Sequence, residues 1–284
     1  MGRLTHTAYP RTVAGNILPP PPGRTEWSQP VPLSSCRPLP QSTVIQASFL
    51  GRAPLPGFAA TGFLSMAAKR LFDVTAALCL LAVSLPLMLV AAFLIKFEDG
   101  GPVLFRQARV GKLGRVFTIY KLRSMTVDAE TRQGALERQN EMDGPVFKIG
   151  DDPRVTRVGY FLRLWNVDEL PQLVNVLRGE MSMVGPRPMS LRDFCRFEAD
   201  WAMRRFAVKP GLTCLWQITP GRNALRFQEW MELDLRYLDT RSFLGDMLIC
   251  LKTAPVCLSL RWPRKSRLVP AIPAKSSESC RECA

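Results

Sequence analysis

The longest hydrophobic pattern in the chain is an uncharged run over residues 74–95, which reads VTAALCLLAVSLPLMLVAAFLI. A membrane helix needs about 20 predominantly apolar residues, so this run predicts one membrane helix within residues 66–100. Lys69 and Arg70 precede the run and Lys96 follows it. Because positive charge flanks both ends, the positive-inside rule gives no direction of crossing.

Pro86 lies near the middle of this run, two residues after Ser84. Proline removes one helical hydrogen bond and bends the axis, and a serine hydroxyl can satisfy the carbonyl that is freed. The pattern itself fits two structures equally well. One is a straight spanning helix that tolerates a proline, and the other is a bent helix that enters and leaves by the same face of the membrane.

A second apolar pattern has the period of a short helix and includes Leu170, Leu173, Val174 and Leu177. Pro171 fits only in the first turn of that helix, where its missing N–H costs nothing. Asp168 and Glu169 then lie at the helix start, where unpaired backbone N–H groups stabilise a carboxylate and would also attract a phosphate. Arg178 and Gly179 supply the stop signal.

Shorter patterns predict the rest of a domain that covers residues 101–258. Apolar runs around Val103 and Val116, with a turn at residues 111–114, predict a small β-hairpin at the membrane surface. Further helices are predicted over residues 127–143, 194–206, 227–238 and 243–251. Residues 209–213 predict a turn and residues 214–217 a short extended piece. The apolar face of residues 243–251 fits either core packing or the membrane interface.

The two ends of the chain lack such patterns. Residues 1–65 are rich in Pro, Ser and Gly without apolar periodicity, which predicts a disordered leader and no secretory signal. Met66 opens MAAKRLFDV just before the membrane run, so a start of translation at Met66 is a second interpretation of the leader. Residues 259–284 predict a basic, disordered tail. The Cys280-x-x-Cys283 pair within it lacks the second pair that a zinc site needs.

Composition narrows the chemistry. The net charge of +14 predicts an anionic partner, which could be a membrane surface, a nucleotide or a nucleic acid. His6 is the only histidine, and it lies in the leader. Catalysis by a Ser-His-Asp or Cys-His arrangement is therefore excluded, and nucleophilic or acid/base work falls to carboxylates. The scattered cysteines are typical of reduced thiols that face the cytosol.

The strongest candidate for chemistry is the pair Asp168 and Glu169, which is followed by Gly185-Pro186-Arg187-Pro188. First-turn acids are often only stabilising, but two prolines around one arginine hold that arginine in a fixed place. A fixed arginine near two carboxylates suits an anionic substrate with a divalent cation bridging it to the acids.

The segments DELPQLVNVLRGEMSMVGPRP, FKIGDDPRVTRVGYFLR and KPGLTCLWQ, in their order along residues 68–253, resemble the bacterial sugar transferase family. These are monotopic phosphoglycosyl transferases that act on polyprenol phosphate. The resemblance implies an α+β, mostly helical fold, with one N-terminal re-entrant membrane helix broken near Ser84 and Pro86. A compact cytosolic catalytic domain with interfacial amphipathic helices and a small β-hairpin follows.

The resemblance also implies the roles of individual residues. Asp168 would be the attacking carboxylate and Glu169 would bind Mg²⁺. The residues expected to contact the substrate are Lys121, Arg123, Arg163, Pro186, Arg187, Pro188, Gln217 and Arg222. The chain departs from the family pattern in two places. Ser84-Leu85-Pro86 is one residue wider than the family's Ser-Pro break, and Cys214 and Thr219-Pro220 stand where glycine and serine are usual.

The implied reaction moves a sugar 1-phosphate from a nucleoside diphosphate sugar, with UDP expected, onto polyprenyl phosphate at the bacterial inner membrane. The catalytic domain would face the cytosol, and a homodimer is left open. Rival interpretations are a catalytically silent scaffold for polysaccharide assembly and a lipid-carrier phosphatase. Binding of nucleic acid is disfavoured, because stacking aromatics and a groove-binding helix are not evident. The sugar, the base and the polysaccharide stay open.

Overall fold

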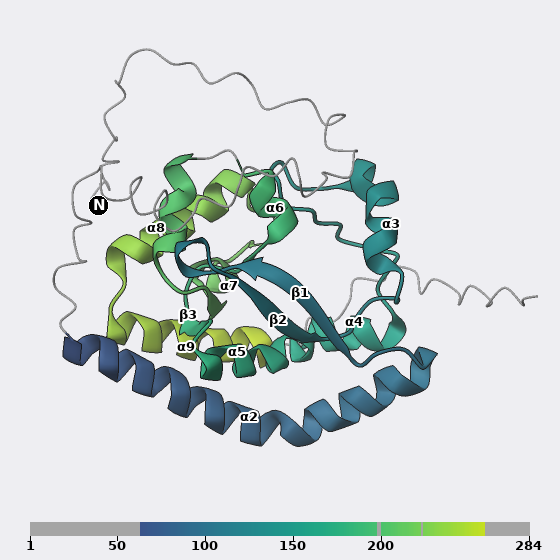
Figure 1. Cartoon of the computed structure of the whole chain (residues 1–284), viewed down its shortest axis with the longest axis horizontal. Coiled ribbons are helices and arrows are strands. Elements are labelled where there is room, and N and C mark those ends of the chain that lie inside the picture. The colour runs from purple at the N-terminus through teal and green to yellow at the C-terminus, as the bar shows by residue number, and fades with distance from the viewer. Residues whose placement is uncertain (1–62, 198–199, 223, 259–284) are drawn as a thin grey trace, which may run out of the picture.

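The computed structural model describes residues 63–258, apart from residues 198, 199 and 223. Figure 1 shows helix α2 (Phe63–Asp99) as a long, bowed rod along one side of a domain that is built from all the later elements. The expected α+β, mostly helical fold is confirmed. The predicted leader, the tail, His6 and the Cys280-Cys283 pair lie outside the described residues.

Helix α2 continues through Pro86 without interruption. The Ser84 hydroxyl donates to the Leu81 carbonyl at 3.4 Å. Pro86 instead frees the carbonyl of Ala82, four residues earlier. The expectation that Ser84 satisfies the carbonyl freed by Pro86 is therefore wrong. The helix is bent in Figure 1 but not broken.

Most of the apolar surface of α2 faces outward. It is the one helix among the described residues that is long and apolar enough to cross a membrane, and only 11% of its most apolar stretch is buried within the protein. Its exposed large apolar side chains are Met66, Leu71, Leu78, Leu80, Val83, Leu85, Leu87, Leu89, Val90, Phe93, Leu94 and Phe97. A soluble protein rarely exposes so large an apolar surface, so the surface fits contact with lipid.

Two small sheets follow α2. Strands β1 (Leu104–Val110) and β2 (Val116–Leu122) form the predicted hairpin, with a turn that contains the 3-10 helix η3 (Lys112–Gly114). Strand β4 (Met189–Ser190) extends the hairpin into a three-stranded sheet of order β2-β1-β4. A second sheet pairs β3 (Ser182–Val184) with β5 (Gly211–Thr213) in parallel.

Helices fill the rest of the domain. The α-helices after α2 are α3 (Ala129–Leu136), α4 (Arg157–Leu164), α5 (Leu173–Arg178), α6 (Leu191–Cys195), α7 (Leu215–Ile218), α8 (Phe227–Thr240) and α9 (Phe243–Leu258). The further 3-10 helices are η4 (Glu137–Gln139), η5 (Val167–Gln172) and η6 (Asp200–Ala207). The predictions of helix over 227–238 and 243–251 are confirmed, and α3 with η4 confirms helix within 127–143.

Three local predictions are wrong. Residues 194–206 do not form one helix, because α6 ends at Cys195 and η6 begins only at Asp200. Residues 209–213 contain β5 rather than a turn alone, since Gly211 and Thr213 pair with a strand far back in the sequence. Residues 214–217 are not extended, because the Gln217 side chain accepts a hydrogen bond from the Cys214 backbone N–H at 3.1 Å and stabilises the short helix α7.

The hydrophobic core joins α2 to the domain at two places. Toward its N-terminal end, Ala77 packs into a cluster with Ile119 of β2, Leu173 of α5 and Ile249 of α9. Toward its C-terminal end, Ala91 and Ile95 pack into a separate cluster with Leu122 and Leu162. A third cluster lies under α6, η6 and α8 and contains Phe194, Phe206, Trp230 and Met231.

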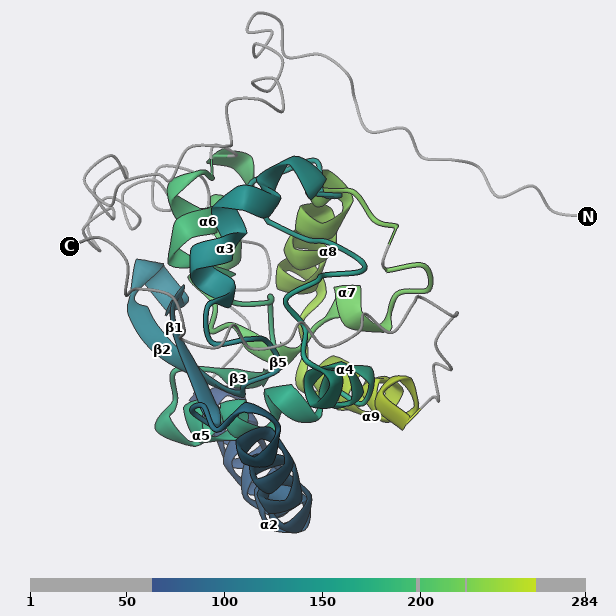
Figure 2. The same ribbon diagram turned by 90° about the vertical axis from the view of Figure 1, so that its right-hand side faces the viewer.

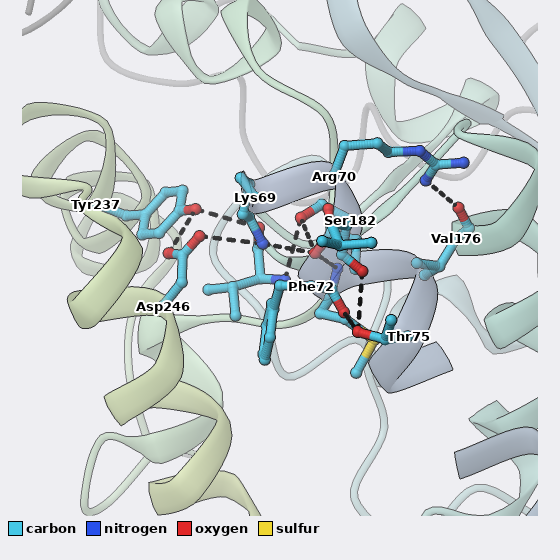
Figure 3. A network of polar contacts seen from close by, with 12 residues as sticks. Lys69, Arg70, Phe72, Thr75, Val176, Ser182, Tyr237 and Asp246 are labelled. Carbon is cyan, nitrogen blue, oxygen red and sulfur yellow. Dashed lines mark hydrogen bonds and ion pairs between the residues drawn. The ribbon is translucent and has the colours of Figure 1, made fainter. Parts of the chain in front are cut away.

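A buried polar network anchors the N-terminal end of α2 (Figure 3). Lys69 forms ion pairs with Asp73 at 2.6 Å and with Asp246 of α9 at 3.1 Å, and Tyr237 of α8 donates to Asp246 at 3.0 Å. Asp73 also accepts hydrogen bonds from the Ser182 hydroxyl and the Met183 N–H of β3.

Beside this network, Arg70 donates to the Val176 and Leu177 carbonyls at 2.7 and 2.8 Å. These carbonyls lie at the C-terminal end of α5, where a cation is favourable. The start of α2 is thus bonded to α5, β3 and α9.

The C-terminal end of α2 is bonded to the same domain. Arg123, just after β2, donates both terminal nitrogens to the Asp99 carboxylate and its Nε to the Pro102 carbonyl at 2.6 Å. The Glu98 carboxylate accepts from the Arg157 and Val158 N–H groups at the start of α4, at 2.9 and 3.2 Å. With 37 residues, α2 is about 55 Å long. A helix with both ends bonded to one domain favours entry and exit by the same face of a membrane over crossing.

Helices α4, α5 and α9 lie on the side of the domain along which α2 runs (Figures 1 and 2). The helix α9 exposes Leu244, Leu248 and Leu251, and α4 exposes Phe161. Residues 243–251 therefore do both, since Ile249 packs into the core while the exposed leucines fit a membrane interface. The position of these helices in a membrane stays a prediction.

Gly159 in α4 permits the helix to lie in close contact with the backbone of Ser124, and this contact can be tested. A Cβ built there would lie 2.0 Å from the Ser124 carbonyl oxygen, whereas a Cβ at Gly134 in α3 meets nothing within 4 Å. We expect Gly159→Ala to destabilise the protein by about 1–3 kcal/mol through overpacking against backbone. Gly134→Ala should be neutral or stabilising, by up to about 1 kcal/mol. Thermal unfolding in detergent compares the two, and equal midpoints would contradict the packing described.

The topology of α2 can be tested by cysteine labelling in a cysteine-free background. Ala68→Cys and Gly100→Cys should both be labelled by an impermeant reagent from the cytosolic side only. Pro86→Leu removes the bend and restores a straight apolar helix of about 33 Å over residues 74–95, close to the hydrocarbon thickness of about 30 Å. This change should shift part of the Ala68→Cys labelling to the far side. Far-side labelling of Ala68→Cys without Pro86→Leu would show that α2 spans.

Candidate active site

The candidate site begins at a sharp bend before η5. Asn166 adopts a left-handed conformation with φ 54°, which asparagine tolerates better than most residues. The chain then enters η5 with Asp168 and Glu169 in its first turn and with Pro171 inside it. The prediction of a helix start at the two acids is confirmed, although the first turn is 3-10 and α5 follows from Leu173. The predicted stop is also confirmed, since Gly179 ends α5 in the left-handed conformation with φ 79°.

Glu169 is held by two cations from distant segments. Lys121, at the end of β2, and Arg187, in the loop between β3 and β4, each lie 2.8 Å from the same oxygen, Oε1 of Glu169. Burial alone would raise the pKa of Glu169, but Arg187 and Lys121 outweigh it and hold that pKa well below its usual range. Glu169 is therefore a permanently charged carboxylate that joins three elements.

Asp168 has a different environment from its neighbour. Its side chain is buried, yet none of the described residues donates a hydrogen bond to its carboxylate or forms an ion pair with it. Burial raises the pKa of Asp168, and the nearby Lys121 only partly opposes that rise. The two adjacent acids thus divide into one that is neutralised by cations and one that has no bonded partner within the described chain.

The donor set at Glu169 fits a single divalent cation bound jointly with a substrate. Both protein cations contact Oε1, and within the described residues no hydrogen bond reaches Oε2. The described residues contain no cluster of three or more potential metal ligands. Mg²⁺ is usually held by one or two carboxylates plus substrate phosphate oxygens, so Glu169 Oε2 suits it and an all-protein metal cage is not formed.

The Pro-Arg-Pro loop is fixed by tight backbone contacts. The Gly185 N–H donates to the Thr213 carbonyl at 3.0 Å, and the Gly211 N–H donates to the Pro186 carbonyl at 2.9 Å. A Cβ at Gly211 would lie 2.0 Å from the Gly185 nitrogen, so only glycine fits there. The loop and β5 therefore pass each other in direct backbone contact.

Two further arginines hold this loop from its other sides. Arg205 donates to the Arg187 carbonyl at 2.8 Å and is itself paired with the fully buried Asp234 at 2.7 Å. Arg109 of β1 donates to the Pro188 carbonyl at 3.0 Å. Sequence reasoning missed these supports, because their partners are backbone carbonyls or lie on another helix.

The strand that carries Lys121 is bonded to α5 through Asn175. The buried Asn175 amide accepts from the Tyr120 N–H at 3.2 Å and donates to the Thr118 carbonyl at 2.7 Å. The hydrophobic pattern gave no sign of this residue, because the predicted apolar stripe of the helix does not include it. The amide thus bonds to backbone groups at the edge of β2, and this fixes the position of Lys121 relative to η5.

The other predicted site residues lie farther from Glu169. Arg163 of α4 donates its Nε to the Ser124 hydroxyl at 2.8 Å and acts electrostatically on Asp168. Arg123 is bonded to Asp99, as described above, and supports α2. The structure thus brings Lys121, Arg187 and Pro188 together around Glu169, and places Arg163 on the side of Asp168.

Gln217 and Arg222 lie around the ring of Trp216. Arg222 donates to the Gln217 carbonyl at 2.8 Å, and its guanidinium lies 5.9 Å from the Trp216 ring centre. The Arg187 guanidinium lies 5.8 Å from the same ring. Trp216 therefore joins the predicted nucleotide-side residues to the Pro-Arg-Pro loop through two cation–π contacts.

A narrow pocket opens beside Glu169. It is lined by Arg109, Ile119, Lys121, Glu169, Gln172, Arg187, Pro188, Gly211 and Leu212. Three predicted substrate-contacting residues, Lys121, Arg187 and Pro188, are among them. Arg109 and Gln172 were not predicted, although Gln172 lies within the DELPQL segment and only three residues after Glu169.

Comparisons with known proteins identify the family of the chain. Residues 64–260 match the family described as "Bacterial sugar transferase". The chain is 44% identical over 193 residues to galactosyl transferase CpsE of Streptococcus agalactiae serotype III, a match that covers 67% of this chain and 42% of that protein. It is 42% identical over 197 residues to the UDP-glucose:undecaprenyl-phosphate glucose-1-phosphate transferase of Caulobacter vibrioides. This match covers 67% of this chain and 70% of that protein. It is 40% identical over 200 residues to exopolysaccharide production protein ExoY of Rhizobium meliloti. This match covers 68% of this chain and 86% of that protein. The chain thus spans less than half of the first relative and most of the other two.

Asn175→Ala tests the link between α5 and the Lys121 strand. The change leaves the Tyr120 N–H and the Thr118 carbonyl without their buried partner, which costs about 1–3 kcal/mol per unsatisfied group. We expect a clear fall in the midpoint of thermal unfolding. Gln228→Ala on the exposed face of α8 removes an amide that bonds only to Glu232 at the surface, and it should change the midpoint little. Equal effects of the two changes would contradict the role given to Asn175.

Proposed function

The chain belongs to the bacterial sugar transferase family, and from that membership we propose that it is a phosphotransferase of polysaccharide synthesis. It transfers a sugar 1-phosphate from a nucleoside diphosphate sugar, with UDP as the expected nucleotide, to polyprenyl phosphate. The products are polyprenyl-diphosphate-sugar and the nucleoside monophosphate. The names of the Caulobacter and Rhizobium relatives support both the reaction class and the link to exopolysaccharide.

The observation that carries this proposal is the division between Asp168 and Glu169. A carboxylate that acts as a nucleophile needs oxygen atoms that are not held in ion pairs. Asp168 forms no ion pair within the described chain, whereas Glu169 forms two. Burial disfavours the ionised form of Asp168, so that carboxylate gains from forming a bond to phosphorus. Transfer of a phosphoryl group further requires positioning and neutralisation of charge, which Lys121 and Arg187 supply.

The proposed reaction has two displacement steps. In the first, an Asp168 oxygen attacks the phosphorus that carries the sugar, and the bond from that phosphorus to the bridging oxygen breaks. The bridging oxygen leaves with the nucleoside monophosphate, and an aspartyl-phosphosugar remains. In the second, a polyprenyl phosphate oxygen attacks the same phosphorus and the Asp168 carboxylate is released. The electron pairs balance without any oxidant or reductant.

The remaining residues bind and orient the substrates. Arg187 and Lys121 hold diphosphate oxygens, and Arg163 approaches from the side of Asp168. Bound Mg²⁺, held by Glu169 Oε2 and substrate oxygens, would supply charge neutralisation at the diphosphate. Because both ends of α2 are bonded to the catalytic domain, the lipid phosphate and the soluble nucleotide can reach the site from one face. We place that face at the cytosolic side of the inner membrane.

The test of the function uses membranes that contain the protein, polyprenyl phosphate and a panel of nucleotide sugars. Release of nucleoside monophosphate that depends on polyprenyl phosphate is the expected result, and it also identifies the base and the sugar. Release without the lipid would identify a hydrolase instead. No release with any sugar would favour a scaffold.

Asp168→Asn should abolish transfer, by at least about 10³-fold, because it removes the attacking charge with little change in volume. Membrane insertion should be unchanged. Rapid quenching of the unsubstituted protein with sugar-labelled nucleotide sugar should trap label on the chain. Label on the Asp168→Asn variant, or turnover near the original rate, would sink the covalent assignment.

A further inference from the structure

The pocket beside Glu169 contains two polar side chains that the proposed reaction leaves without a role. They are Gln172 of η5 and Arg109 of β1, and both line the pocket together with Lys121 and Arg187. Each has a buried nitrogen atom that makes no hydrogen bond within the structure described, Nε2 of Gln172 and Nε of Arg109. Buried polar groups are nearly always hydrogen-bonded, so two such atoms in one pocket indicate a missing partner.

Gln172 shares a face of η5 with Glu169. Residues three apart in a 3-10 helix eclipse each other, so the side chains of positions 169 and 172 project in the same direction. The side chain of Gln172 is almost completely buried, since the residue is only 3% exposed. Its amide is therefore fixed beside the carboxylate that already binds Lys121 and Arg187, and it can donate into the space between them.

Arg109 lines the pocket from strand β1. Along β1, Arg106 is exposed and stacks on Tyr120, whereas Arg109 points to the other face and bonds to Pro188. Burial lowers the pKa of Arg109 to about 10, and repulsion from Arg187 adds to that effect. The pocket lining thus has three cations, Arg109, Lys121 and Arg187, against the single carboxylate of Glu169. This excess of positive charge calls for an anionic ligand.

We propose that Gln172 and Arg109 bind phosphate oxygens of the nucleoside diphosphate sugar, with Gln172 donating through Nε2 and Arg109 through Nε. They would bind these oxygens together with Lys121 and Arg187, which line the same pocket. Lys121 and Arg187 each have more N–H donors than Glu169 uses, so phosphate oxygens can bond to the same two cations while Glu169 stays paired. The identity of the ligand as a diphosphate rests on the proposed function, but its anionic character does not.

The first test measures binding of inorganic pyrophosphate to the full-length protein in detergent by calorimetry, with EDTA present. Gln172→Met keeps the size of the side chain and removes the donor. We expect the affinity to fall by about tenfold or more, as for loss of a hydrogen bond to a charged group. Gln228→Met on the exposed face of α8 is the control and should bind as the original protein does. Unchanged affinity in Gln172→Met would overturn the proposal.

A second pair of variants separates local contact from general charge. Arg109→Gln and Arg106→Gln remove the same charge from the same strand on opposite faces. The affinity for pyrophosphate should fall by about tenfold or more in Arg109→Gln and by less than about twofold in Arg106→Gln. Equal losses would show that only the overall field matters and would overturn the role of Arg109.

Gln172→Glu guards against a purely structural effect. The added carboxylate meets the surplus cations, so the unfolding midpoint should hold or rise while pyrophosphate binding is lost. A variant that lowers the midpoint but binds pyrophosphate normally would contradict the assignment.

The kinetic readout separates this inference from the proposed function. With an active protein, Gln172→Met should raise KM for the nucleotide sugar more than it lowers kcat. If the protein binds pyrophosphate in this Gln172-dependent way but transfers no sugar phosphate, the proposed function fails and the anion site stands. If transfer proceeds and Gln172→Met leaves both KM and pyrophosphate affinity unchanged, the proposed function stands and the inference fails.

Discussion

The constraint on which the rest of the structure depends is that both ends of one apolar helix are bonded to the same polar domain. At the start of α2, Lys69 and Arg70 reach α9 and the end of α5. At its end, Glu98 and Asp99 hold the start of α4 and Arg123. These bonded elements flank η5, so the site is held between two anchors of the lipid-facing helix. The distance between the lipid-facing surface of α2 and the candidate site is therefore fixed by hydrogen bonds and ion pairs. It does not depend on a flexible linker.

Within that frame, Glu169 has an organising role as well as the chemical role proposed for it. It draws together Lys121 from a strand end and Arg187 from a loop, and each of these is fixed again from behind. Asn175 holds the strand, and the buried pair Arg205 and Asp234 holds the loop carbonyl. Breaking one partner of such a buried arrangement costs more than the arrangement itself contributes, because a charge is then left without compensation. This cost favours a single geometry around Asp168.

Much of this could be predicted from the sequence, where the signal is local. The apolar run predicted α2, glycine and alternation predicted the β1–β2 hairpin, and the Pro171 and Gly179 signals bounded the helix that carries the acids. The errors share one cause, which is dependence on distant partners. Strand β5 exists because Gly211 meets β3, and the burial of Asn175 follows from the edge of β2. The ion pair of Arg123 with Asp99 was likewise not foreseen, and the predicted contact of Arg123 with substrate stays a prediction. No window of neighbouring residues contains that information.

The network around Lys69 has a consequence for how the protein reaches its folded state. Asp73 and Lys69 lie at the start of the apolar helix, and their partner Asp246 is in α9, the last helix described. During synthesis, α2 therefore emerges long before Asp246 exists, with polar groups that water or lipid headgroups must solvate. The helix can form early, but its contacts with Asp246 are complete only when α9 has packed against it. Completion of the domain around α2 thus waits for the C-terminal part of the described chain.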